Sequence, residues 1–88
     1  MFQLIWRDSA LDALADHYVA ADPKTRQKMA SLVDAMNNRL KNDPLGEGES
    51  RPGNYRVTFL NGLTITFDVL LGELTVRVIR VHQYSKRR

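Results

Sequence analysis

The stretch from residue 51 to residue 84 constrains the fold most, because it reads as three consecutive β-strands. Val, Ile, Thr, Phe and Tyr alternate with polar residues along RPGNYRVTFLNGLTITFDVLLGELTVRVIRVHQY, and turn-forming dipeptides occur at Pro52-Gly53, Asn61-Gly62 and Leu71-Gly72. Strand-forming runs separated by such short turns are typical of linked hairpins. The rest of the chain must therefore supply a cover for an antiparallel sheet.

The register of these strands can be predicted, because a slip of one residue moves every side chain to the opposite face. A two-residue loop at Asn61-Gly62 would put the apolar residues of one strand on the face of the polar residues of the next. We therefore expect a three-residue loop, 60–62, with Gly62 left-handed, and a two-residue second loop at Leu71-Gly72. The expected pairs are Tyr55 with Phe67, Val57 with Ile65, Phe67 with Val76, and Ile65 with Val78.

These registers predict one apolar and one polar face. The apolar face consists of Tyr55, Val57, Phe59, Leu63, Ile65, Phe67, Val69, Leu74, Val76 and Val78. The polar face consists of Arg56, Thr58, Thr64, Thr66, Asp68, Thr75 and Arg77. Arg56, Thr66 and Arg77 are expected side by side on it, which favours this face as the working surface. An ordinary solvated sheet face is the alternative.

The N-terminal half predicts the cover. Residues 2–6 are a short apolar run, expected to add a strand to the sheet. Apolar residues then recur at helical spacing, first at Leu11, Leu14, Ala15, Tyr18 and Val19, and again at Met29, Leu32, Val33, Met36 and Leu40. Asp22-Pro23, an N-cap followed by proline, separates the two helices. The prediction is one α+β domain over residues 1–88, in the order β-α-α-β-β-β, with a helical hairpin on one face of a mostly antiparallel four-stranded sheet.

Charge is distributed unevenly along the chain. Residues 1–50 hold six Lys or Arg against eight Asp or Glu, whereas residues 51–88 hold seven against two. The basic sheet half suits a polyanion such as a nucleic acid, although a frayed basic tail is an alternative for the last residues. The absence of cysteine favours a reducing, cytoplasmic location, and no stretch reaches the ~20 apolar residues of a membrane span. The two histidines lie in different elements without clustered carboxylates, so no metal site is expected.

One group of side chains near the sheet has the composition of a metal-independent ribonuclease site. It consists of Arg56, Arg77, Arg80, His82 and Tyr84, with Glu47, Glu49 and Arg51 in the loop before the sheet. RNA cleavage without a metal needs groups that take a proton from the 2′-hydroxyl and give one to the leaving oxygen, and cations that stabilise the phosphorane. His, Glu, Tyr and Arg can fill these roles, but small basic domains often end in such residues.

The sequence resembles the RelE/ParE superfamily of toxins from bacterial toxin-antitoxin systems over nearly its whole length. The most specific part is Gly53-Asn54-Tyr55-Arg56-Val57, which resembles the family's Gly-x-Tyr-Arg-Val entry into the sheet; residues 78–82 are similar to its last strand. The resemblance implies a cytoplasmic toxin held in a complex by a cognate antitoxin, with no cofactor. RelE-like members cleave mRNA on the ribosome, whereas ParE-like members bind DNA gyrase. Thr64 stands where many members carry a second arginine.

Our leading hypothesis is a ribosome-dependent mRNA endoribonuclease. Its expected catalytic residues include Arg56 and Arg77, which hold the scissile phosphate, and His82, which acts as a general acid or base. Tyr84 is expected to stack on or orient a nucleobase. Glu49 or Glu47 is expected to act as the partner general base. Its expected RNA-binding residues are Arg51, Arg80, Lys86 and Arg87. A ParE-like gyrase binder and a non-toxic RNA-binding member are the alternatives.

Overall fold

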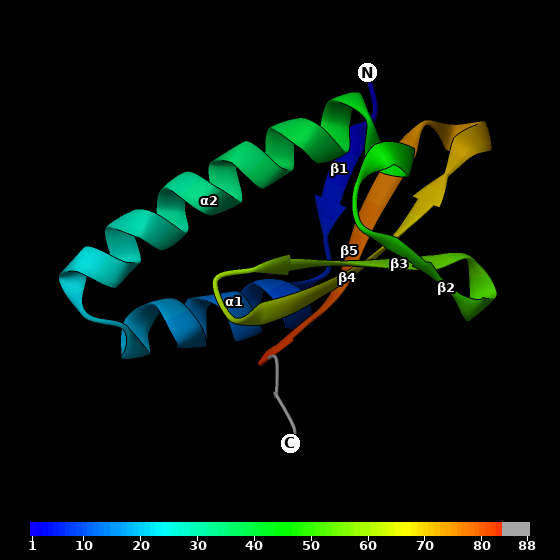
Figure 1. Ribbon diagram of the computed structural model, residues 1–88. Coiled ribbons are helices and arrows are strands. Elements are labelled where there is room, and N and C mark those ends of the chain that lie inside the picture. Colours follow the sequence, from blue (N-terminus) through cyan, green and yellow to red (C-terminus); the bar gives the residue numbers. More distant parts are fainter. Residues whose placement is uncertain (84–88) are drawn as a thin grey trace.

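Both helices lie on the same side of a five-stranded sheet, as Figure 1 shows. The computed structural model describes residues 1–83. The helices are α1 (Asp8–Ala20) and α2 (Pro23–Asn42), and the strands are β1 (Gln3–Trp6), β2 (Glu49–Arg51), β3 (Tyr55–Leu60), β4 (Leu63–Leu70) and β5 (Thr75–Gln83). The predicted α+β class and the helical hairpin on one face are confirmed. The predicted four strands are wrong, because the loop before the sheet contributes β2 as a fifth.

The strands lie in the order β1-β5-β4-β3-β2. β1 runs parallel to β5, and every other neighbouring pair is antiparallel. The predicted N-terminal strand is therefore present at one edge of the sheet. The short β2 forms the other edge and lies far from both helices (Figure 1).

The turn between the helices is fixed by local hydrogen bonds. The Asp22 carboxylate accepts a 2.7 Å hydrogen bond from the Thr25 backbone N–H, as expected of an N-cap before proline. Hydrogen bonding from the side chain and backbone of Thr25 lowers the pKa of Asp22. Arg26 donates from Nε and Nη2, each at 3.0 Å, to the carbonyls of Tyr18 and Val19 at the end of α1. These contacts satisfy carbonyls that a helix C-terminus leaves unpaired.

The core lies between the helices and the sheet. It consists of Ala10 from α1, of Met29, Met36 and Leu40 from α2, and of Leu60, Leu63, Ile65, Phe67, Val76, Val78 and Val81 from the strands. The periodic Met and Leu residues of α2 are core residues, as predicted. The Trp6 Nε1 donates to Asn37 Oδ1 at 3.2 Å and so joins β1 to α2. Among residues 1–83, neither helix combines the length and the apolar composition that a bilayer crossing requires.

The register predicted for β3 and β4 is wrong by one residue. Leu60 pairs with Leu63, so the loop is the two-residue Asn61-Gly62, in which both residues have positive φ, 47° and 86°. Asn-Gly with two positive φ values is the turn that best matches the twist of a hairpin. The slip exchanges the faces of β3, which moves Tyr55, Val57 and Phe59 away from the helices. The buried Val57 is accordingly absent from the helix-packed core.

The pairing register of β4 and β5 is shifted by two residues from the prediction, and a bulge interrupts it further along. Val69 pairs with Val76 and Phe67 with Val78, because the loop spans residues 71–74 and not only Leu71-Gly72. A shift of two residues leaves the faces unchanged. Beyond Phe67 the register skips Ile79, so that Thr66 pairs with Arg80.

Candidate nucleic-acid interface

The side of the sheet that faces away from the helices, called the open face below, carries four rows of side chains. The strand registers give them as Glu49, Val57, Thr66 and Arg80; as Arg51, Tyr55, Asp68, Arg77 and Ile5; as Phe59, Thr64 and His82; and as Leu70, Thr75 and Gln3. The face therefore combines arginines, one histidine, hydroxyl groups and aromatic rings. These side-chain types bind phosphates and bases in protein–nucleic acid complexes.

The bulge at Ile79 places Arg80 and His82 on this face. Strict alternation after Val78 would turn both side chains toward the helices. One extra residue reverses the alternation, so Val81 enters the core in their place. The local sequence Val78-Ile79-Arg80-Val81 is thus divided between the two sides of the sheet.

The cations of the open face differ in how much of their charge is neutralised. The Arg77 guanidinium donates to Asp68 through Nε at 3.0 Å and Nη2 at 2.5 Å. These hydrogen bonds, together with the charge of Asp68, raise the pKa of Arg77. Arg51 Nη2 lies 3.2 Å from Glu49 Oε1, an exposed pair of the kind that contributes little. Within residues 1–83, the Arg80 side chain has no hydrogen-bond or ion-pair partner.

A pocket of about 340 Å³ lies between Arg80 and the β2 edge of the open face. Its lining residues are Arg51, Pro52, Tyr55, Val57, Thr66, Ile79 and Arg80. Val57 is 8% exposed and Tyr55 is 42% exposed. The pocket thus has buried apolar surface, an accessible aromatic ring and arginines among its walls.

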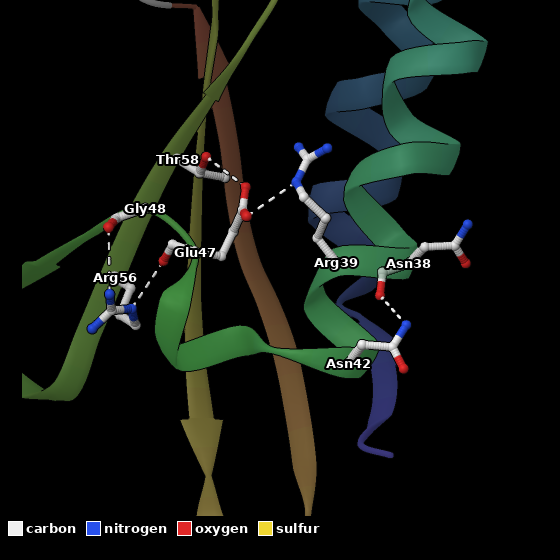
Figure 2. A network of polar contacts seen from close by, with 7 residues as sticks. All are labelled: Asn38, Arg39, Asn42, Glu47, Gly48, Arg56 and Thr58. Atoms are coloured by element: carbon white, nitrogen blue, oxygen red, sulfur yellow. Dashed lines mark hydrogen bonds and ion pairs between the residues drawn. The ribbon is translucent and has the colours of Figure 1, made fainter.

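Arg56 does not belong to the open face, which corrects the prediction that it lies beside Thr66 and Arg77. It pairs with Phe67, which in turn pairs with Val78, so its side chain leaves the sheet on the helix side. Figure 2 shows its guanidinium turned to the segment before β2, where Nε donates to Glu47 O at 3.0 Å and Nη2 to Gly48 O at 3.3 Å. Nη1 donates to Ser50 Oγ at 3.0 Å. Arg56 is therefore a structural residue that fastens this segment to β3.

Glu47 belongs to the same structural network. Its carboxylate accepts from Arg39 Nε at 3.0 Å and from Thr58 Oγ1 at 3.3 Å (Figure 2). The network links the last turn of α2 to β3, on the helix side of the sheet close to its β2 edge. Both carboxylate oxygens are engaged, which does not fit the predicted role of Glu47 as a base.

The structure does not assemble the predicted catalytic group. Arg56 lies on the other side of the sheet, and five residues of strand, roughly 15 Å, separate Arg77 from His82. Glu49 lies three strands away from Arg80 in its row, about 14 Å between backbones. The predicted Arg51, Arg80 and His82 do share the open face. Tyr84, Lys86 and Arg87 lie outside the described residues.

Two features of the open face were missed by the sequence prediction. Tyr55 and Val57, assigned to the core, line the pocket, and Asp68 neutralises the arginine expected to bind phosphate. The Asn61-Gly62 dipeptide was the signal that could have placed Tyr55 and Val57 on the open face, because its preferred turn gives the observed register of β3 and β4. Among the described residues no three His, Asp or Glu side chains gather as metal ligands.

No protein-family model and no curated protein matches the sequence, but solved structures do match the fold. A chain of the chromosomal ParDE toxin-antitoxin system from P. aeruginosa is 22% identical, with a TM-score of 0.73 over 97% of this chain and 98% of that one. A chain of the intact E. coli RelBE toxin-antitoxin complex is 16% identical, with a TM-score of 0.67 over 99% and 100%. The isolated E. coli RelE toxin is 14% identical, with a TM-score of 0.65 over 99% and 88%. The chain therefore shares the fold of these chains.

Proposed function

We propose that this protein is the toxin of a toxin-antitoxin system. The support is a likeness of fold that spans nearly the whole chain, to structures described as toxin-antitoxin complexes and as an isolated toxin. The proposal implies a cognate antitoxin that binds the protein and blocks its action. Induction in a growing bacterium should stop growth, and co-expression of the protein encoded next to it should restore growth.

We further propose that the toxin acts through its open face on single-stranded RNA, with mRNA on the ribosome as the target. The observation that carries this step is Arg80, which is unpaired among the described residues and borders a pocket with an aromatic wall. Positive charge attracts the phosphate chain, and aromatic rings stack on bases that are not already paired. Binding of this kind is sufficient to obstruct a message without any chemical step.

Cleavage of the bound message is the second candidate function, favoured by the position of His82 on the same strand and face as Arg80. Histidine can take or give a proton near neutral pH, and an arginine can stabilise the phosphorane. Arg80 would then have the role that the sequence suggested for Arg56. One histidine supplies one of the two proton transfers. For the other we propose Tyr84, in addition to its expected role of stacking on or orienting a nucleobase.

One experiment separates these functions. The wild type, His82→Ala and Arg80→Gln are induced in turn, and the 5′ ends of ribosome-bound mRNA are mapped. New ends that disappear in His82→Ala indicate cleavage, whereas arrest with intact messages that survives His82→Ala but not Arg80→Gln indicates binding. Arrest accompanied by a DNA-damage response and co-purification of gyrase would overturn the RNA target. No arrest by the wild type would overturn the toxin assignment.

A further inference from the structure

The pocket on the open face has an unusual floor for the polar side of a sheet. Val57 is 8% exposed, yet it lies outside the core that the helices cover. Ile79, the residue of the bulge, lines the same pocket. Apolar surface in a small depression favours a ligand that brings apolar surface of its own.

The walls specify the shape and polarity of that ligand. The Tyr55 side chain comes from the same strand as Val57, is 42% exposed and offers an aromatic ring. Thr66 contributes a hydroxyl that can donate or accept, and Arg80 contributes a guanidinium that can only donate. A free phosphate or a carboxylate would use the guanidinium but leave the apolar floor and the ring without a partner.

We propose that this pocket binds one unpaired nucleobase of an RNA strand, which rests on the proposed function of the open face. The base stacks on Tyr55 and covers Val57, and its polar edge faces Thr66 and Arg80. The arginines at the two ends of the pocket, Arg51 and Arg80, are then placed near the phosphates on either side of the base. Single-stranded RNA is recognised in this manner, by bases stacked on aromatic rings and hydrogen-bonded at their edges.

The volume of the pocket agrees with a single base. About 340 Å³ is at the lower end of the roughly 300–1,000 Å³ range of ligand pockets. A pocket of this size has room for one base, and we place the neighbouring bases of the strand outside it. The pocket is a subsite that fixes the position of the strand on the face and, through it, the phosphate nearest His82.

The test compares RNA binding by matched tyrosine variants. Fluorescence anisotropy with a labelled oligouridylate is measured for the wild type, Tyr55→Ala, Tyr55→Leu and Tyr55→Phe, with Tyr18→Ala as control. Tyr18 has the same 42% exposure but lies on α1. Loss of one stacked base should weaken binding by roughly 5- to 140-fold in Tyr55→Ala. Tyr55→Phe should bind like the wild type, Tyr55→Leu should resemble Tyr55→Ala, and Tyr18→Ala should show no loss.

An abasic strand of equal length separates stacking from phosphate contacts. The wild type and Tyr55→Ala should bind it with the same affinity, because it offers no base to the pocket. Equal losses of Tyr55→Ala on both strands, or full affinity of Tyr55→Leu for the oligouridylate, would overturn the proposal. So would tight, Tyr55-dependent binding of an acidic peptide without any RNA binding. Circular dichroism of each variant confirms that it is folded.

The outcome is independent of the toxin assignment, which depends on growth arrest and rescue by the antitoxin. Arrest by the wild type together with unchanged RNA affinity in Tyr55→Ala rejects the base pocket and leaves the toxin function standing. Failure of the wild type to arrest growth, with Tyr55-dependent RNA binding intact, rejects the toxin function and leaves the pocket standing.

Discussion

Gly48→Ala should strongly destabilise the protein, because Gly48 combines a left-handed backbone with close contact to β3. Its φ is +72°, and a Cβ added there would lie 2.2 Å from the Val57 carbonyl oxygen. The left-handed conformation costs a non-glycine residue about 1–2 kcal/mol. The clash must also move the segment away from the Arg56 guanidinium, and losing a hydrogen bond to a charged group costs about 1.5–3 kcal/mol. We expect a loss of about 2.5–5 kcal/mol in the free energy of unfolding.

Two other glycines separate these contributions. Gly62 has a φ of +86° but no heavy atom within 4 Å of its added Cβ, so Gly62→Ala should lose only the left-handed cost, about 1–2 kcal/mol. Gly72 has neither feature, and Gly72→Ala should stay within about 0.5 kcal/mol of the wild type. Urea unfolding followed by circular dichroism measures all three. If Gly48→Ala were no more destabilising than Gly62→Ala, the segment before β2 would not be held against β3 as described.

Four further substitutions test individual charges. Asp22→Ala should lower the melting temperature at neutral pH. Because folding lowers the pKa of Asp22, its carboxylate stabilises the protein fully above the ordinary pKa of 3.8. The difference in melting temperature from the wild type should therefore fade as the pH drops through the lowered pKa. Asp68→Asn should free the charge of Arg77 and tighten oligouridylate binding, with a log–log salt slope steeper by about 0.7. Arg56→Gln should lose about 1–3 kcal/mol of stability but keep its RNA affinity. Arg80→Gln should keep its stability but bind RNA more weakly, in the same unfolding and anisotropy measurements.

The architecture could be predicted from the sequence because its signals were long and mutually consistent. Two signals predicted α2 correctly. Its apolar periodicity places Met29, Met36 and Leu40 on the buried stripe, and Asp22 caps its first turn. Alternation in β4 and the first part of β5 gave the correct faces. The edge strand β2 could not be predicted, since its three residues carry no alternation and form a strand only because β3 is beside them.

The register of β3 was mispredicted because apolar residues were assumed to face the helices. That assumption holds where the helices cover the sheet, but β3 lies near the edge, where the segment before β2 covers it instead. Polar side chains on the covered side of β3 are satisfied by this segment, as with Thr58 and Glu47. Hydrophobicity alone therefore did not determine the face, whereas the preferred geometry of the Asn61-Gly62 turn did.

The positive charge available to a ligand is also smaller than the sequence suggests, because contacts within the folded chain engage most of the arginines. The four arginines of the sheet half within residues 51–83 suggest a uniformly basic surface, yet Arg56 is bound to backbone carbonyls on the helix side and Arg77 is held by Asp68. Arg51 is shared with Glu49, and the bulge alone turns Arg80 outward, beside a pocket and without a partner among the described residues. An electrostatic attraction concentrated at one arginine cannot bind a phosphate chain tightly without further contacts. The aromatic wall of the pocket supplies such a contact, which is why the specificity of this face should depend on Tyr55 as much as on its arginines.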